Sequence, residues 1–222
     1  MHQTSTSEIP SQKARILAAI PRKWLVGLFF WANRVAKLFA GLNVNPNVLS
    51  ILGLLAGIGA GFLYAFGHPG WAAVLITICG VFDILDGRVA AHANKKSLYG
   101  AIFDSTLDRY SEFFIYLGLA VYFRNRWPLW ILFFTFLGST MVSYTRARAE
   151  GLGIDCRVGI MQRAERMILL VIATLVGIGF KVFDPAMIVV LIAIALFSNI
   201  TALQRTFYVR KVEQQRKLEK ES

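Results

Sequence analysis

Four aspartates lie close together in an otherwise apolar part of the 222-residue sequence. They are Asp83, Asp86, Asp104 and Asp108, within the stretch FDILDGRVAAHANKKSLYGAIFDSTLDRYSE at residues 82–112. Residues three or four apart share one face of a helix, so Asp83 pairs with Asp86 and Asp104 pairs with Asp108. The short polar connection between the pairs predicts an antiparallel helical hairpin that brings all four carboxylates to one depth.

Carboxylates gathered in this way require neutralisation. Two charges ~4 Å apart repel by about 4 kcal/mol even at an effective dielectric constant of about 20. All-oxygen ligation is typical of Mg²⁺ or Mn²⁺, and four acids can hold two such ions. A two-metal site is suited to phosphoryl transfer. The alternative is a structural ion-pair network with the neighbouring Arg88 and Arg109, but acids inside a membrane segment favour function.

The elements that carry these acids are expected to be membrane helices. Hydrophobic residues make up 56% of the sequence and charged residues only 17%, which predicts an all-α protein with several membrane spans. Residues 21–41 mix apolar side chains with Arg34 and Lys37, which favours an amphipathic helix lying in the membrane interface. Residues 1–20 are predicted to be a polar tail and residues 207–222 a basic tail. Six transmembrane helices are predicted within a domain at 46–206, at residues 46–66, 71–91, 99–123, 128–150, 163–180 and 185–206.

The basic residues indicate the orientation of these spans. Most of them fall in the N-terminal region, in the two connections after the second and fourth spans, and at the C-terminus, whereas the other side keeps Arg124, Arg126 and Lys181. This asymmetry places the N-terminus and the aspartates on the cytoplasmic side, and we expect a multi-pass protein of the cell (inner) membrane. The net charge of +11 is then a topology signal. Because no aromatic–basic platform accompanies the charge, we expect no nucleic-acid partner.

The acidic stretch resembles the signature of the CDP-alcohol phosphatidyltransferase family, Asp-x-x-Asp-Gly-x-x-Ala-Arg, then eight or nine residues, then Gly-x-x-x-Asp-x-x-x-Asp. One position departs from the signature, because Ala91 stands where the family has arginine. Arg88, Lys95 and Lys96 are candidates to replace the missing charge. The seven matching positions are Asp83, Asp86, Gly87, Ala90, Gly100, Asp104 and Asp108.

This resemblance implies an enzyme that moves a phosphatidyl group from CDP-diacylglycerol, or a related CDP-lipid, to a small polar alcohol and releases CMP. It implies that Asp83, Asp86, Asp104 and Asp108 hold two Mg²⁺ or Mn²⁺ ions, and that Asp108 is the catalytic base for the acceptor hydroxyl. The resemblance also implies donor contacts from Asn47, Ser50, Asp86, Gly87, Ser97 and Gly100.

Two short sequence features have a structural explanation as well. The segment NPNVLS at residues 45–50 is a helix start, with Asn45 as the cap and Pro46 in the first turn. Glycines at 53, 57 and 61 form a face suited to close helix contact, either within one chain or between two subunits. Since the family tends to be dimeric, the resemblance also implies a homodimer among membrane lipids.

Four arginines follow the aspartates in the sequence, near the end of the fourth predicted span and the start of the fifth. Guanidinium groups bind phosphate through paired hydrogen bonds, so an acceptor that carries phosphate is favoured. Flanking positive charge explains any single one of them nearly as well. The passage resembles the phosphatidylinositol-phosphate synthase branch, which implies inositol phosphate as the acceptor, with glycerol 3-phosphate as the alternative. The four are Arg146, Arg148, Arg163 and Arg166.

Two other classes of membrane protein also use intramembrane acids. A cation-coupled transporter predicts acids near the midplane and broken helices in a repeated architecture. A prenyltransferase places two aspartate-rich motifs on widely separated helices. The single compact motif at one end of a hairpin favours the phosphatidyltransferase.

Overall fold

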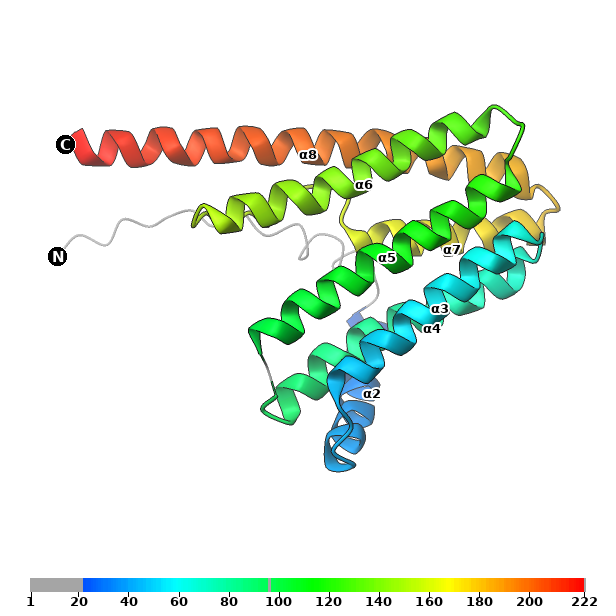
Figure 1. Ribbon diagram of the computed structural model, residues 1–222, viewed down its shortest axis with the longest axis horizontal. Helices are drawn as coiled ribbons and strands as arrows, with labels where there is room; N and C mark the ends of the chain where they lie inside the picture. Colours follow the sequence, from blue (N-terminus) through cyan, green and yellow to red (C-terminus); the bar gives the residue numbers. More distant parts are fainter. Residues whose placement is uncertain (1–21, 96, 222) are drawn as a thin grey trace.

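The computed structural model describes residues 22–95 and 97–221, and over these residues the secondary structure is entirely helical (Figure 1). The predicted all-α class is therefore confirmed for this part of the chain. The tail predicted at residues 1–20 lies outside the described residues, as does Lys96. The helices are α2 (Arg22–Gly41), α3 (Pro46–Ala65), α4 (Pro69–His92), α5 (Leu98–Tyr122), α6 (Pro128–Gly151), α7 (Arg163–Gly179) and α8 (Phe183–Glu221).

Side-chain caps set the first residues of α3 and α5. The Asn45 side chain accepts a hydrogen bond from the Asn47 backbone N–H at 3.0 Å, and Pro46 opens α3. The Ser97 hydroxyl accepts a hydrogen bond from the Gly100 backbone N–H at 2.9 Å at the start of α5. Both caps lie near the acidic hairpin, so they fix which residues of α3 and α5 face it.

Helix α3 packs closely against α4 and α5. A Cβ atom added at Gly57 would lie 2.5 Å from the Ser111 Cβ atom, and the backbones of Gly61 and Gly118 are in direct contact. Real Cβ atoms do not approach other groups so closely, which explains why small residues occupy this contact. The glycine face of α3 is thus used within the chain, with Gly57 and Gly61 against α5 and Gly53 against α4.

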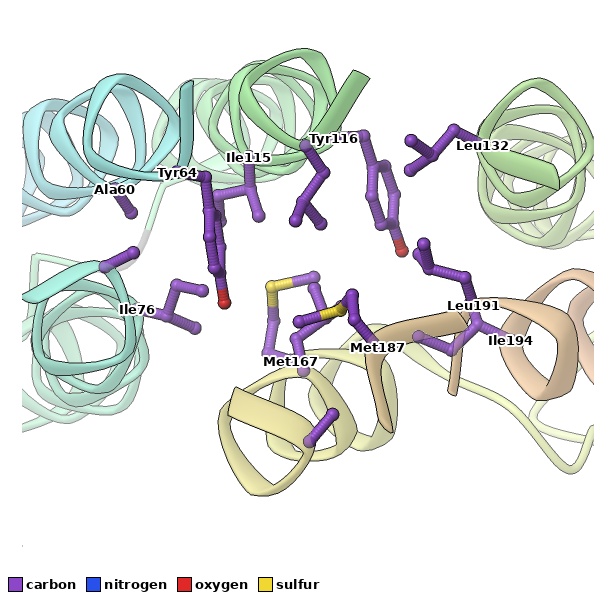
Figure 2. Close-up of a cluster of buried hydrophobic side chains, with 14 of the residues drawn as sticks. Ala60, Tyr64, Ile76, Ile115, Tyr116, Leu132, Met167, Met187, Leu191 and Ile194 are labelled. Carbon is purple, nitrogen blue, oxygen red and sulfur yellow. The ribbon is translucent and has the colours of Figure 1, made fainter. Parts of the chain in front are cut away.

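A buried apolar cluster joins this three-helix unit to the remaining helices (Figure 2). Tyr64 of α3 and Ile115 of α5 are fully buried there, together with Met187 and Leu191 of α8. The Tyr64 hydroxyl also lies 2.6 Å from the Thr174 hydroxyl of α7, which satisfies both polar groups. The cluster therefore holds α7 and α8 against the hairpin that carries the aspartates.

Within residues 22–95 and 97–221, three helices, α3, α6 and α8, are long and apolar enough by length and composition to cross a membrane. Large apolar side chains such as Trp71, Phe133 and Phe180 are exposed on the outside of the bundle, as expected of a lipid-facing surface.

The basic tail predicted from residue 207 is an extension of the last helix. Helix α8 continues to Glu221 and extends beyond the other helices in Figure 1. No glycine or proline interrupts residues 203–221, and Glu213 and Lys217 form an i,i+4 ion pair at 2.8 Å.

Candidate active site

The structure brings the carboxylates of the two adjacent helices together. Oxygen atoms of Asp83 on α4 and of Asp104 and Asp108 on α5 all lie within 4.8 Å of one another. Asp86 is only 4% exposed, and its carboxylate accepts a hydrogen bond from the Ser50 hydroxyl of α3 at 2.7 Å. Three helices therefore position the four acids that the sequence analysis singled out.

Arg163, the first residue of α7, lies inside this cluster. Its Nη1 atom is 3.1 Å from Asp83 Oδ2 and 2.7 Å from Asp108 Oδ1, and its Nη2 atom donates to the Ser111 hydroxyl at 3.0 Å. Within the part of the chain that the structure describes, the buried Nε atom of Arg163 has no hydrogen-bond partner. One guanidinium cannot balance the charge of four carboxylates if all of them are ionised.

The donor set fits a hard divalent cation. Asp83, Asp104 and Asp108 converge here and offer carboxylate oxygen, which is the ligand type that Mg²⁺ and Mn²⁺ prefer. Bound cations would compensate the remaining negative charge, and they would compete with Arg163 for the oxygens of Asp83 and Asp108. The residues that would hold them are those predicted from the sequence.

A cavity of about 290 Å³ adjoins the cluster. Asp104 belongs to both, and Asp86 also lines the cavity. The first turns of α3 and α5 also line it, and helix N-termini favour negatively charged groups. All six residues predicted to contact the nucleotide-lipid donor line this one cavity: Asn47, Ser50, Asp86, Gly87, Ser97 and Gly100.

Ala91 stands where the family signature has arginine, and nearby cations were candidates to replace the missing charge. Lys95 lines the cavity, and its Nζ atom donates to the Asn43 side chain at 2.5 Å. Arg88 instead donates to Asn33 of α2 at 2.9 Å, on another side of α4. Lys96 lies outside the described residues, and of the other two cations Lys95 is the one that lines the cavity.

Arg166 is not where the sequence analysis expected it. It is fully buried, and its Nε and Nη2 atoms donate to the two carboxylate oxygens of Glu112 at 2.6 and 2.8 Å. The Tyr116 hydroxyl donates to the same Glu112 at 3.2 Å. A guanidinium committed to a buried carboxylate is not free to bind an acceptor phosphate, so the assignment of Arg166 to that role is corrected.

The Glu112–Arg166 pair was missed because its two residues are 54 positions apart. A signal was nevertheless present, since Glu112 follows Asp108 by one helical turn and Arg166 follows Arg163 by three residues. If Arg163 contacts Asp108, the same two helix faces bring the next acid and the next arginine together.

The other two arginines near the fourth predicted span lie on the exposed end of α6. Arg146 forms an ion pair with Glu150 one turn away, at 2.8 Å, and Arg148 is exposed. Among the described residues, no ion pair joins either of them to the aspartates. The structure therefore brings Arg163 to the cluster but not Arg146 or Arg148.

Comparison with known proteins agrees with this geometry. The archaetidylinositol phosphate synthase of Pyrococcus horikoshii is 35% identical over 179 residues, which cover 80% of this chain and 90% of that protein. The crystal structure of Mycobacterium tuberculosis phosphatidylinositol phosphate synthase with CDP-DAG bound matches with a TM-score of 0.73 and 28% identity, covering 80% of this chain and 92% of that chain. The same enzyme in complex with manganese and citrate matches with a TM-score of 0.71 and 28% identity, covering 80% and 88%.

The model of the family described as CDP-alcohol phosphatidyltransferase matches residues 43–203. This range includes α3 to α7 completely, with the four aspartates and the cavity beside them. The chain therefore belongs to the CDP-alcohol phosphatidyltransferase family and is an integral membrane enzyme.

Proposed function

We propose that this enzyme transfers a phosphatidyl group from CDP-diacylglycerol, or a related CDP-lipid, to inositol phosphate and releases CMP. The observation that carries the proposal is the continuity between the carboxylate cluster and the cavity, which share Asp104. The names of the two relatives support the choice of acceptor, since the Pyrococcus protein is an archaetidylinositol phosphate synthase and the Mycobacterium protein a phosphatidylinositol phosphate synthase.

The cavity is proposed to bind the nucleotide-lipid donor. Lys95 and the first turns of α3 and α5 provide positive charge for its diphosphate. The Ser50 hydroxyl holds Asp86 in a fixed orientation at the wall of the cavity. At Gly87 an added Cβ atom would meet nothing within 4 Å, so the absence of a side chain there leaves space that a ligand can use.

Asp83, Asp86, Asp104 and Asp108 are proposed to hold two Mg²⁺ or Mn²⁺ ions. The manganese complex of the Mycobacterium relative supports a divalent metal. When bound, such ions supply positive charge to the diphosphate and to the reacting oxygens.

Asp108 is proposed as the catalytic base. Its carboxylate takes the proton of the acceptor hydroxyl while that oxygen attacks the phosphorus on the lipid side of the diphosphate. The bond from this phosphorus to the bridging oxygen breaks, and CMP leaves with that oxygen. Because a carboxylate is a weak base, proton transfer accompanies the attack rather than preceding it. Arg163, which donates to Asp108, keeps the carboxylate oriented.

Three arginines remain as proposed contacts for the acceptor phosphate. Arg163 is the best supported, because it lies beside the catalytic carboxylate and its buried Nε has no partner among the described residues. Arg146 and Arg148 are exposed at the end of the bundle where α7 begins. We retain them in the proposal as residues that contact the acceptor once it is bound.

For the membrane arrangement, we propose that α3 to α8 form six spans and that α2 lies in the interface. The positive charge near the active site favours its placement on the cytoplasmic side of the inner membrane. A homodimer also remains a prediction from the family resemblance. The glycine face of α3 does not provide its interface, since α4 and α5 cover that face.

The proposal is tested by CMP release from CDP-diacylglycerol by the purified protein with Mn²⁺ or Mg²⁺. Inositol 1-phosphate, glycerol 3-phosphate and unphosphorylated inositol are supplied separately. Release that requires inositol phosphate supports the proposal, and release that requires glycerol 3-phosphate replaces its acceptor. An absence of release with every alcohol, from protein that binds Mn²⁺ and is folded, contradicts it.

A further inference from the structure

A second, basic cavity lies between α2 and the end of α4. Its volume is about 430 Å³, and it is lined by Phe30, Asn33, Arg34, Lys37 and His92. Two permanent cations and one histidine thus surround one hollow, and Asn33 is held in place by a hydrogen bond from Arg88 at 2.9 Å. From this arrangement we propose that the cavity binds the phosphate group of an anionic membrane lipid.

This basic cavity is separate from the active site. Gly87 and Ala90 of α4 line the active-site cavity, whereas His92 of the same helix lines the basic one. Ala90 and His92 are two residues apart, which places their side chains roughly 200° apart around the helix axis. Helix α4 therefore stands between the two cavities.

The chemistry of the lining suits a phosphate monoanion. The Arg34 guanidinium can donate two parallel hydrogen bonds to phosphate oxygens, and the Lys37 ammonium adds a compact charge. A zwitterionic headgroup carries its own ammonium, which the two cations would repel. The cavity should therefore select lipids whose headgroup is negatively charged overall.

The surface of α2 indicates that the ligand is a lipid. Phe30, Trp31 and Leu38 are 65, 49 and 63% exposed and lie within one turn of Arg34, so apolar and basic side chains alternate along the outside of this helix. Such a mixture is typical of helices in the headgroup region, and basic pockets next to membrane helices bind anionic headgroups. Phe30 lines the cavity and is also exposed on the outside of α2. Its ring therefore offers an apolar surface for the part of an acyl chain next to the glycerol.

The test measures lipid binding by native mass spectrometry on the full-length protein in a neutral detergent, without any CDP-lipid. Dioleoylphosphatidylglycerol, dioleoylphosphatidylcholine and inorganic phosphate are titrated separately. The variant Arg34→Gln/Lys37→Gln removes the two cations of the cavity. The control Arg124→Gln/Lys181→Gln removes two exposed cations from the opposite ends of α5 and α7.

Losing two cations next to the membrane should weaken phosphatidylglycerol binding by roughly tenfold or more in the Arg34/Lys37 variant, and little in the control. Equal phosphatidylglycerol affinity in the parent and the Arg34/Lys37 variant overturns the proposal, as does an equal loss in the control. Displacement of the lipid by millimolar inorganic phosphate would show a site for free anions instead. If the double variant does not fold, Lys37→Gln and His92→Gln are measured singly by the same criteria. Since no turnover is involved, failure here leaves the proposed reaction untouched.

Discussion

The buried ion pair between α5 and α7 permits a quantitative prediction. Replacing Glu112 by glutamine keeps the shape of the side chain but removes its charge, which leaves the Arg166 guanidinium uncompensated at 0% exposure. Breaking a buried pair by removing one partner costs about 3–5 kcal/mol. At about 2–4 °C for each kcal/mol in a chain of this size, Glu112→Gln should lower the melting temperature by roughly 6–20 °C.

The melting temperature of each purified variant in detergent is measured by thermal unfolding, followed by tryptophan fluorescence, and is compared with that of the parent protein. The double variant Glu112→Leu/Arg166→Met removes both charges together, and replacing a buried pair by apolar groups is often close to neutral. The double variant should therefore have a higher melting temperature than either Glu112→Leu or Arg166→Met alone. The matched control is Glu150→Gln, which removes the exposed partner of Arg146 and should change stability by about 1 kcal/mol or less.

Two results would refute this reasoning. A Glu112→Gln variant that melts within about 2 °C of the parent would mean that Arg166 is not committed to Glu112. A double variant as unstable as the sum of the single ones would show that the two residues do not interact, since coupled neighbours depart from additivity.

Further predictions concern the reaction and the packing of α3. Asp108→Asn should abolish CMP release in the turnover assay while the protein stays folded, and full activity would disprove the role of Asp108 as base. Arg146→Ala should mainly raise the KM for the acceptor and leave kcat close to the parent value; an unchanged KM would remove Arg146 from the acceptor site. Ala91→Arg should raise activity if the missing family charge matters, whereas no change would indicate that Lys95 already compensates. Gly61→Val should destabilise the fold by about 1–3 kcal/mol in thermal unfolding, because α5 is in contact there, while the α4 variant Gly80→Ala, with nothing within 4 Å, should not.

Much of the geometry of the candidate active site could be predicted from the sequence because its residues are close together along the chain. Asp83, Asp86, Asp104 and Asp108 lie on one hairpin, where helical periodicity and a short connection largely determine their relative positions. The caps at Asn45 and Ser97 follow from local backbone chemistry as well.

The contributions of α7 could not be derived in this way. Nothing local specifies that Arg163 enters the cluster while Arg166 is buried against Glu112, since both arginines lie in the same basic segment. Their different roles depend on how α7 is rotated against α5, and that rotation is set by the packing of the whole bundle around Tyr64 and Leu170.

The two ion pairs between α5 and α7 also explain why neighbouring arginines serve different purposes. The Glu112–Arg166 pair is buried, and the Glu112 carboxylate accepts a further hydrogen bond from Tyr116. The pair therefore fixes the distance between α5 and α7. The Asp108–Arg163 pair lies one helical turn away, within the carboxylate cluster, where Arg163 also contacts Asp83. A shared guanidinium can exchange one carboxylate for a phosphate oxygen while it keeps its contact with the other carboxylate. The first pair would therefore keep α7 in place if the contacts of the second pair changed when substrate binds, as the proposed function requires.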